Sequence, residues 1–129
     1  MKIMKKSIIM ISSALLLFAS CGQQHKAEST VEDMLEDNLT NASQMKVIMH
    51  EQLDSTRLLT NSNVLLIRKS MADIPYYKKG IKYAPMPKDN MLMISCVVYQ
   101  LGNKKYRDTY YLDRSLENVI AIKSKAWWY

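Results

Sequence analysis

The segment MLMISCVVYQLGNKKYRDTYYL, residues 91–112, determines the fold expected for this chain. Its first part, residues 91–100, is rich in Val, Ile and Tyr, and its last part, residues 106–112, alternates between apolar and polar side chains. Both patterns are typical of β-strands. Gly102-Asn103 lies between them, where a tight hairpin turn needs residues that tolerate a positive φ. The segment therefore predicts an antiparallel β-hairpin.

Two further apolar runs extend this hairpin into a sheet. Residues 118–123 become apolar again after the turn-forming stretch 113–118, and they predict a third strand in the same antiparallel meander. The short run Val-Leu-Leu-Ile at residues 64–67 predicts a first strand at one edge. The expected sheet therefore has three to four antiparallel strands.

The part of the chain before these strands has helical spacing. Ser29 and Glu32 match the capping box that opens a helix, and a row of apolar residues follows at intervals of three and four. The row consists of Val31, Met34, Leu35, Leu39, Ala42, Met45, Met49 and Leu53. A helix over residues 30–57 would be about 42 Å long, against a domain diameter of about 30 Å. The weak helix formers at residues 38–43 are where a break is expected. The prediction is an α+β fold in which an N-terminal helix, whole or broken, packs on one face of the sheet.

The segment between residues 70 and 90 is predicted to be a long loop. It holds all three prolines, and long loops in small domains often carry function. Tyrosines beside cations are common at binding surfaces, so this loop offers a candidate interaction patch. The patch consists of Tyr76, Tyr77, Lys78, Lys79 and Lys82. The alternative is a solvated loop whose tyrosines lie back on the sheet.

The chain ends on three aromatic residues, Trp127, Trp128 and Tyr129. Exposing three rings at a chain end lowers solubility, so one interpretation folds them back to close the core. The other places them in a binding surface with Lys123 and Lys125 alongside, stacking on sugar rings or filling a partner's pocket. The sequence leaves both interpretations open.

No arrangement of residues predicts catalysis or metal binding. The two histidines are His25 and His50, and a dyad of His50 with Cys96 has no local sequence signature. Asp108 and Asp113 are five residues apart, which puts them on opposite faces of a strand. We therefore expect no enzyme, no cofactor and no metal.

The first residues of the chain form an export signal. Lys2, Lys5 and Lys6 precede the apolar run at residues 8–19, and the small residue Ser20 follows. The run has 12 residues, whereas about 20 are needed to span a bilayer, so it is too short for a transmembrane anchor.

The stretch Phe18-Ala19-Ser20-Cys21 resembles the lipobox of bacterial lipoproteins, although Phe18 stands where that pattern usually has Leu. The resemblance implies that the Cys21 thiol takes a diacylglyceryl group and becomes the first mature residue. Gly22, in place of Asp, implies the outer membrane by resemblance to enterobacterial lipoproteins. If Cys21 is an ordinary thiol, a plain secretory signal remains.

These features divide the chain into three parts. Residues 1–20 are the predicted signal peptide, residues 21–28 the lipidated cysteine with a flexible tether, and residues 29–129 a single small domain. Removal of the three signal-peptide lysines lowers the formal charge from +6 to +3. With Cys21 lipidated, Cys96 has no intramolecular disulfide partner, and we expect it to be a buried, inert thiol.

The remaining charge is unevenly distributed. Residues 26–54 hold two lysines and seven acidic residues, while residues 57–129 hold 13 lysines and arginines and five acidic residues. Either the two halves attract each other across the fold, or the basic half forms a docking face for anionic lipid or polysaccharide.

The expected function is a non-catalytic accessory or structural role. A lipid on Cys21 would fix the protein at a membrane, where the domain binds another envelope protein, for example in a secretion or assembly complex. The alternatives are a module that binds a glycan or another anionic polymer, and a small inhibitor or immunity lipoprotein. Nucleic acid is not an expected partner of an exported chain. Asp54-Ser55-Thr56 also resembles a bacterial O-glycosylation acceptor, which would modify Ser55 or Thr56.

Overall fold

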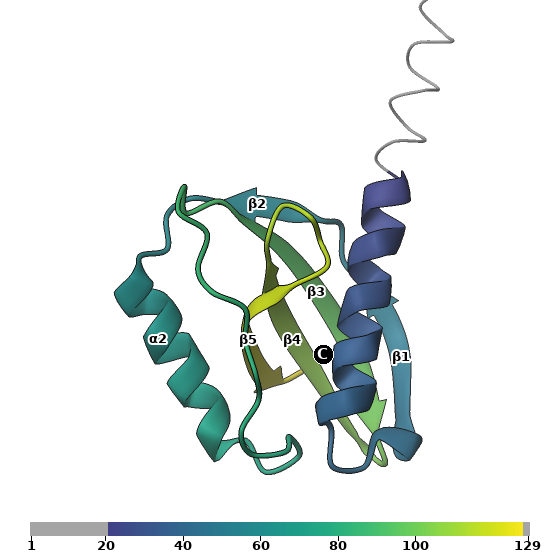
Figure 1. The fold of residues 1–129 in the computed structure, drawn as a ribbon. Helices are drawn as coiled ribbons and strands as arrows, with labels where there is room; N and C mark the ends of the chain where they lie inside the picture. The colour runs from purple at the N-terminus through teal and green to yellow at the C-terminus, as the bar shows by residue number, and fades with distance from the viewer. Residues whose placement is uncertain (1–20, 128–129) are drawn as a thin grey trace, which may run out of the picture.

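The computed structural model describes residues 21–127, so the predicted signal peptide at residues 1–20 and the aromatic residues Trp128 and Tyr129 lie outside it. Residues 21–38 form an N-terminal helix, and a second helix and five strands follow (Figure 1). The later elements are η1 (Ala42–Gln44), β1 (Met45–His50), β2 (Asp54–Thr56), α2 (Asn61–Ser70), η2 (Met71–Asp73), β3 (Leu92–Leu101), β4 (Lys104–Leu112) and β5 (Val119–Ala126). The predicted α+β class is confirmed.

The last three strands form the predicted antiparallel meander. β3 pairs with β4 from Met93↔Leu112 to Leu101↔Lys104, and Gly102 in the connecting turn has a φ of +59°. β4 pairs in turn with β5 as far as Tyr106↔Ala126. The hairpin and the third strand are therefore where the sequence pattern placed them.

At the other edge of the sheet, the structure shows two strands where the sequence predicted the second part of a long helix. Residues 45–50 and 54–56 are the strands β1 and β2, which pair antiparallel with successive parts of β3. Met45, Met49 and Leu53 lie four residues apart and so imitate a helical stripe, but Met45 and Val47 also alternate as a strand requires. The helix ends at residue 38, within the stretch where a break was expected.

The predicted edge strand at residues 64–67 is wrong, because these residues lie in the helix α2. Thr60 caps this helix: its hydroxyl accepts a hydrogen bond from the Asn63 amide at 3.1 Å, and the Asn63 side chain accepts one from the Thr60 amide at 2.9 Å. Val64 is buried against β5, whereas Leu65 and Leu66 are exposed. A run of four apolar residues does not distinguish a strand from a helix.

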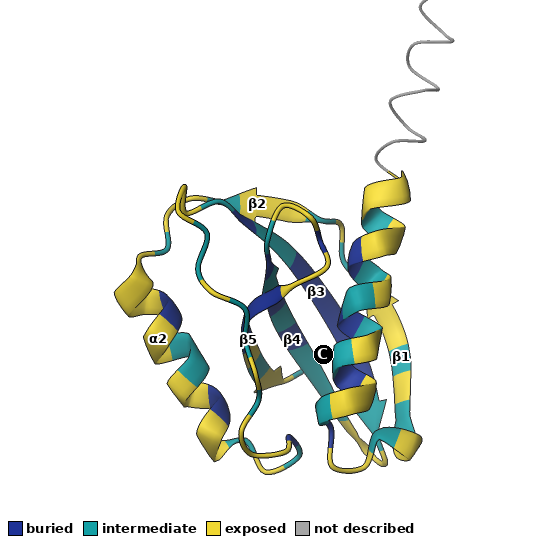
Figure 2. Ribbon diagram, in the orientation of Figure 1, coloured by how far each residue is buried: buried dark blue, intermediate teal, exposed yellow. Residues whose placement is uncertain are grey.

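The N-terminal helix lies on one face of the sheet, as expected, but it includes the predicted tether. Ala27, Val31 and Leu35 form a stripe at intervals of four residues, and all three are fully buried (Figure 2). The Gln24 side chain also accepts a hydrogen bond from the Leu53 amide at 2.7 Å. Residues 21–28 are therefore helical and packed, in place of the flexible segment predicted from their polarity.

The hydrophobic core lies between this helix and the sheet face that it covers, which we call the helix-facing side. Paired residues of neighbouring strands share a face, so the register assigns the side chains. Core residues on this side are Val47, Val97, Tyr99, Tyr110, Leu112, Val119 and Ile122. A smaller cluster packs α2 against Leu92, Ile120 and Ala121.

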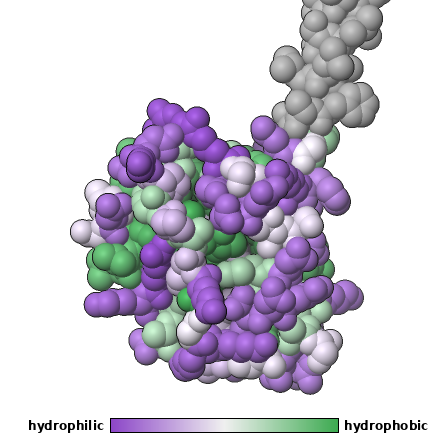
Figure 3. Space-filling view, viewed as in Figure 1, coloured by the Kyte–Doolittle hydropathy of each residue, from purple (hydrophilic) through white to green (hydrophobic). Residues whose placement is uncertain are grey.

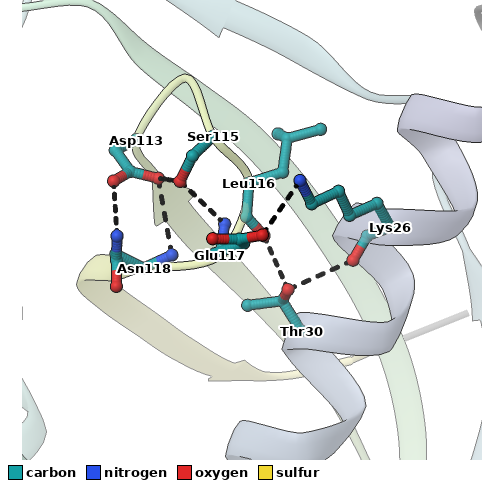
Figure 4. A network of polar contacts seen from close by, with 7 residues as sticks. All are labelled: Lys26, Thr30, Asp113, Ser115, Leu116, Glu117 and Asn118. Carbon is teal, nitrogen blue, oxygen red and sulfur yellow. Dashed lines mark hydrogen bonds and ion pairs between the residues drawn. The ribbon is translucent and has the colours of Figure 1, made fainter.

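The turn between β4 and β5 is held by its own polar side chains (Figure 4). The Asp113 carboxylate accepts hydrogen bonds from the Ser115 hydroxyl at 2.6 Å and the Asn118 side-chain amide at 2.8 Å. Partial burial raises the pKa of Asp113, but these hydrogen bonds lower it more, so its net shift is downward.

The same turn is fastened to the N-terminal helix. The Thr30 hydroxyl donates a hydrogen bond to the Leu116 carbonyl at 2.6 Å, and Lys26 forms an ion pair with Glu117 at 3.1 Å. Leu116 is buried in the core although its φ is +64°, a conformation that side chains other than glycine rarely adopt. Contacts across this interface therefore hold a strained residue in place.

Replacing Thr30 with Val should lower the free energy of unfolding by about 1–2 kcal/mol, because the partly buried Leu116 carbonyl loses its donor. Lys26→Gln is the matched control on the same interface. It should cost less than about 0.5 kcal/mol, because the ion pair with Glu117 is exposed. Urea unfolding measures both, and equal losses would contradict this ranking of the two contacts.

Candidate functional site

The loop after η2 places its two tyrosines on the sheet and not in solvent. Tyr77 is 1% exposed, and its hydroxyl lies 2.5 Å from Asp108 Oδ2 and 2.6 Å from the Tyr110 hydroxyl. Tyr77 therefore does not form part of the candidate interaction patch. Of the two interpretations drawn from the sequence, the structure shows the one in which the loop tyrosines lie back on the sheet.

Tyr76 is half-buried beside Tyr77. Its ring stacks on Tyr106 with centroids 3.9 Å apart, and its hydroxyl lies 2.5 Å from the Ser124 hydroxyl. Burial raises the pKa of Tyr76 to about 12, so it stays protonated and available as a donor at neutral pH. Both tyrosines thus join the loop to the last two strands.

Asp108 is the centre of this polar cluster. Its carboxylate accepts hydrogen bonds from the hydroxyls of Tyr77, Tyr99 at 2.8 Å and Ser124. The residue is fully buried. Burial raises the pKa of Asp108 to about 6, although the three hydroxyl donors oppose that shift.

The hydrogen-bonding groups of this cluster find their partners within the cluster. Each of the two Asp108 oxygens has a hydroxyl donor, and the tyrosine hydroxyls are hydrogen-bonded to Asp108 or to one another. The sequence contained a signal for this arrangement, because Asp108 alternates in phase with Tyr106 and Tyr110 and so had to face the core. The arrangement supports a role in holding the loop on the sheet.

Two lysines of the loop, Lys78 and Lys82, lie beside the acidic helix. The Lys78 ammonium donates to the Asp37 carbonyl at 3.1 Å, and the Lys79 ammonium donates to the Ala72 carbonyl. Lys82 lines a shallow depression together with Asp33 and Asp37. For this part of the chain, acidic and basic segments do lie together across the fold.

Four cations of the strands point the other way. The register puts Lys46, Arg107, Lys123 and Lys125 on the sheet face opposite the helix-facing side. Arg107 there binds Glu51 with two nitrogens, at 2.5 and 2.9 Å. The hydrogen bond from Arg107 lowers the pKa of Glu51, and Lys125 lies close enough to contribute.

Residues considered for catalysis do not converge. His50 pairs with Val97 and lies on the helix-facing side, 3.7 Å from Glu32, while Cys96 lies on the opposite face beside Thr109. The two sides of the sheet thus separate the thiol from the imidazole. Cys96 is buried, as expected, and residues 21–127 contain no group of three His, Cys, Asp or Glu side chains that could hold a metal.

Two of the remaining candidates lie near the ends of the described residues. Cys21 is exposed, with its sulfur unbonded to another cysteine. Trp127 is half-buried, and its backbone amide donates to the Lys105 carbonyl at 3.0 Å, so it continues the pairing of β5 with β4.

In the tripeptide that resembles a glycosylation acceptor, Ser55 is exposed on β2 and Thr56 is half-buried.

An apolar surface that the sequence did not predict follows from the identity of α2 as a helix. Leu65 and Leu66 are exposed on its outer side, and Leu58 in the preceding connection is 88% exposed. Figure 3 shows hydrophobic side chains gathered at the side of the molecule that α2 forms, while most of the remaining visible face is hydrophilic. None of the described helices is long and apolar enough to cross a membrane.

Comparison of the chain with models of protein families, with curated proteins and with solved structures found no match.

Proposed function

We propose that this protein is a lipid-anchored component of the bacterial cell envelope, held at the outer membrane through Cys21, with a non-catalytic role in binding another protein. The observation that carries the proposal is Cys21 itself, which follows an export signal in a lipobox-like context and is exposed in the structure. Two or more acyl chains on one residue give stable membrane attachment.

The packing of the N-terminal helix makes the attachment close. Ala27 is fully buried only six residues after Cys21, which corresponds to about 9 Å along a helix. A lipid on Cys21 would therefore join the membrane to the folded domain without a flexible spacer. A domain attached in this way has a restricted orientation relative to the membrane, so only some of its surfaces can reach a partner.

The polar groups of the domain support a binding role more than a catalytic one. Asp108, whose pKa is raised by burial, is the kind of group that can mark an active site. Its oxygens, however, are occupied by the hydroxyls of Tyr77, Tyr99 and Ser124, and it is fully buried. The cluster therefore supports the fold, and the broad outer faces of the sheet and α2 are left for contact with a partner.

Removal of the Cys21 thiol tests the anchor. In cells, the wild-type protein should sediment with membranes and incorporate labelled palmitate, and Cys21→Ala should lose the label and appear in the soluble fraction. Cys96→Ala is the matched control, because the other thiol is buried beside Thr109 and should leave both properties unchanged. If Cys21→Ala still sediments with membranes, the lipid is not the anchor.

A further inference from the structure

One sheet face carries several cations, of which Arg107 is paired with a carboxylate. Lys46, Met49, Arg107, Thr109, Lys123 and Lys125 surround Val98 on the side opposite the N-terminal helix, and we call this surface the basic face. It extends across all four positions of the sheet, because β1, β3, β4 and β5 each contribute to it. α2 covers only the far end of this side, near Leu92 and Ala121.

Within residues 21–127, few carboxylates lie close to the cations of the basic face. Arg107 is matched by Glu51, but among the described residues no carboxylate lies within 4.0 Å of the ammonium groups of Lys46, Lys123 or Lys125. The loop lysines differ in that they have hydrogen-bond partners within the fold, because Lys78 donates to the Asp37 carbonyl and Lys79 to the Ala72 carbonyl. The lysines of the basic half therefore fall into two groups. Those of the loop contact other parts of the fold, and those of the basic face are directed to solvent.

The apolar side chain that the basic face exposes to solvent is Met49. Val98 is almost fully buried beneath the long side chains around it, and Met49 beside it is 43% exposed. Arg and Met are enriched at protein–protein interfaces, and lysines are tolerated at the rim, where they set the rate and specificity of association. An exposed apolar side chain beside several cations fits a protein surface that carries carboxylates.

The position of the basic face relative to Cys21 favours a protein over lipid headgroups. The N-terminal helix runs for about 26 Å from Cys21 toward the β3–β4 hairpin, which lies at the opposite end of the domain (Figure 1). Lys46 and Lys125 lie toward that hairpin, because their partners Gln100 and Arg107 are close to the turn. An anchor at Cys21 therefore holds these cations away from the membrane.

We infer that the basic face is the docking surface for an acidic surface of a partner protein. The inference rests on the proposed function for the place where the partner is met, but the docking surface itself is defined by the sheet. The carboxylates of the partner would pair with Lys123, Lys125 and Lys46, while its apolar side chains would cover Met49.

Photo-cross-linking in the native cells tests whether the basic face contacts a partner protein. A photo-reactive amino acid at Met49 reports on the basic face, and the same amino acid at Glu36, which is exposed on the N-terminal helix, is the control position. Each is combined with Lys123→Glu/Lys125→Glu or with Lys78→Glu/Lys79→Glu. The two double variants change the net charge equally, and all four lysines are exposed.

The expected result is a protein adduct from position 49 that is absent from position 36, with cross-linked peptides of the partner rich in Asp and Glu. The adduct should decrease at least about tenfold in Lys123→Glu/Lys125→Glu and persist in Lys78→Glu/Lys79→Glu. Equal loss in both variants, an adduct with lipid, or an adduct with a second copy of this chain would overturn the inference. The same experiment in the Cys21→Ala background separates the two proposals, since loss of the anchor with the adduct retained leaves the docking surface intact.

Discussion

Asp108→Asn is expected to stabilise the protein at pH 7 and to leave its stability near pH 4 almost unchanged. Burial raises the pKa of Asp108 from 3.8 to about 6 in the folded state, so the folded protein favours the protonated carboxyl. The stability that this preference contributes is fully present below about pH 4 and is lost as the pH rises to about 6. A shift of this size corresponds to about 3 kcal/mol, which the neutral amide should recover.

The geometry of the cluster allows Asn to replace Asp. The amide oxygen can accept the hydrogen bonds that Tyr77 and Tyr99 now donate to Oδ2. The amide nitrogen can donate to the Ser124 hydroxyl, which then donates to Tyr76. No buried hydroxyl is left without a partner, so the substitution removes a charge without removing the network.

Unfolding in urea at several pH values measures this effect, with Asp113→Asn as the control. The pKa of Asp113 is lowered, so its contribution to stability is present above about pH 4 and lost as the pH falls. The same substitution there should reduce stability at pH 7. If the difference between Asp108→Asn and wild type does not change between pH 4 and pH 7, the pKa of Asp108 is the same in the folded and unfolded states and the account of its burial is wrong.

Asp108 also illustrates how far the sequence predicts this molecule. Residues 106–112 alternate in phase with the strand that they form, and residues 91–100 and 118–123 are apolar runs on either side of them. Such patterns are readable because one face of a meander must be apolar and its turns need particular residues. The same alternation places Asp108 in the core with Tyr106 and Tyr110. The hydrogen bond from Tyr77 was not predictable, since it depends on how a loop of some twenty residues folds back over the sheet.

The elements that were predicted wrongly are short and have ambiguous patterns. Residues 45–50 satisfy both a four-residue and a two-residue spacing, and pairing with β3 decides in favour of a strand. Residues 64–67 are uniformly apolar, and the cap at Thr60 decides in favour of a helix whose outer leucines stay exposed. In both cases tertiary contacts override a local pattern that fits two structures.

The basic face shows a third reason why the structure could not be fully predicted from the sequence. The excess of lysine and arginine after residue 57 is visible in the sequence, but its division into two surfaces is not. Lys78 and Lys123 differ in role only because the loop lies over the helix-facing side, while the register turns Lys123 to the other side with Thr109. The face that a strand residue occupies depends on register, which one sequence fixes only where a clear apolar alternation exists.

Ala27→Asp should lower the free energy of unfolding by more than about 3 kcal/mol, although residue 27 lies in a segment whose composition suggests a tether. Ala27 is fully buried in the core together with Val31 and Leu35, so the substitution places an unpaired carboxylate in an apolar site. Gln23→Asp, one helical turn earlier and exposed, is the matched control and should change stability by less than about 0.5 kcal/mol.

Thermal and urea unfolding of these variants in the unlipidated Cys21→Ala background decide how the domain is attached. If Ala27→Asp unfolds like Gln23→Asp, residues 21–28 do not pack and form a tether that extends up to about 28 Å from the proposed anchor. If it is strongly destabilised, the helix that begins the domain also carries Cys21, the residue proposed to be acylated, since the Gln24 side chain already accepts a hydrogen bond from the Leu53 amide. The membrane then constrains the orientation of the sheet, and the basic face is directed away from the anchor by the fold itself.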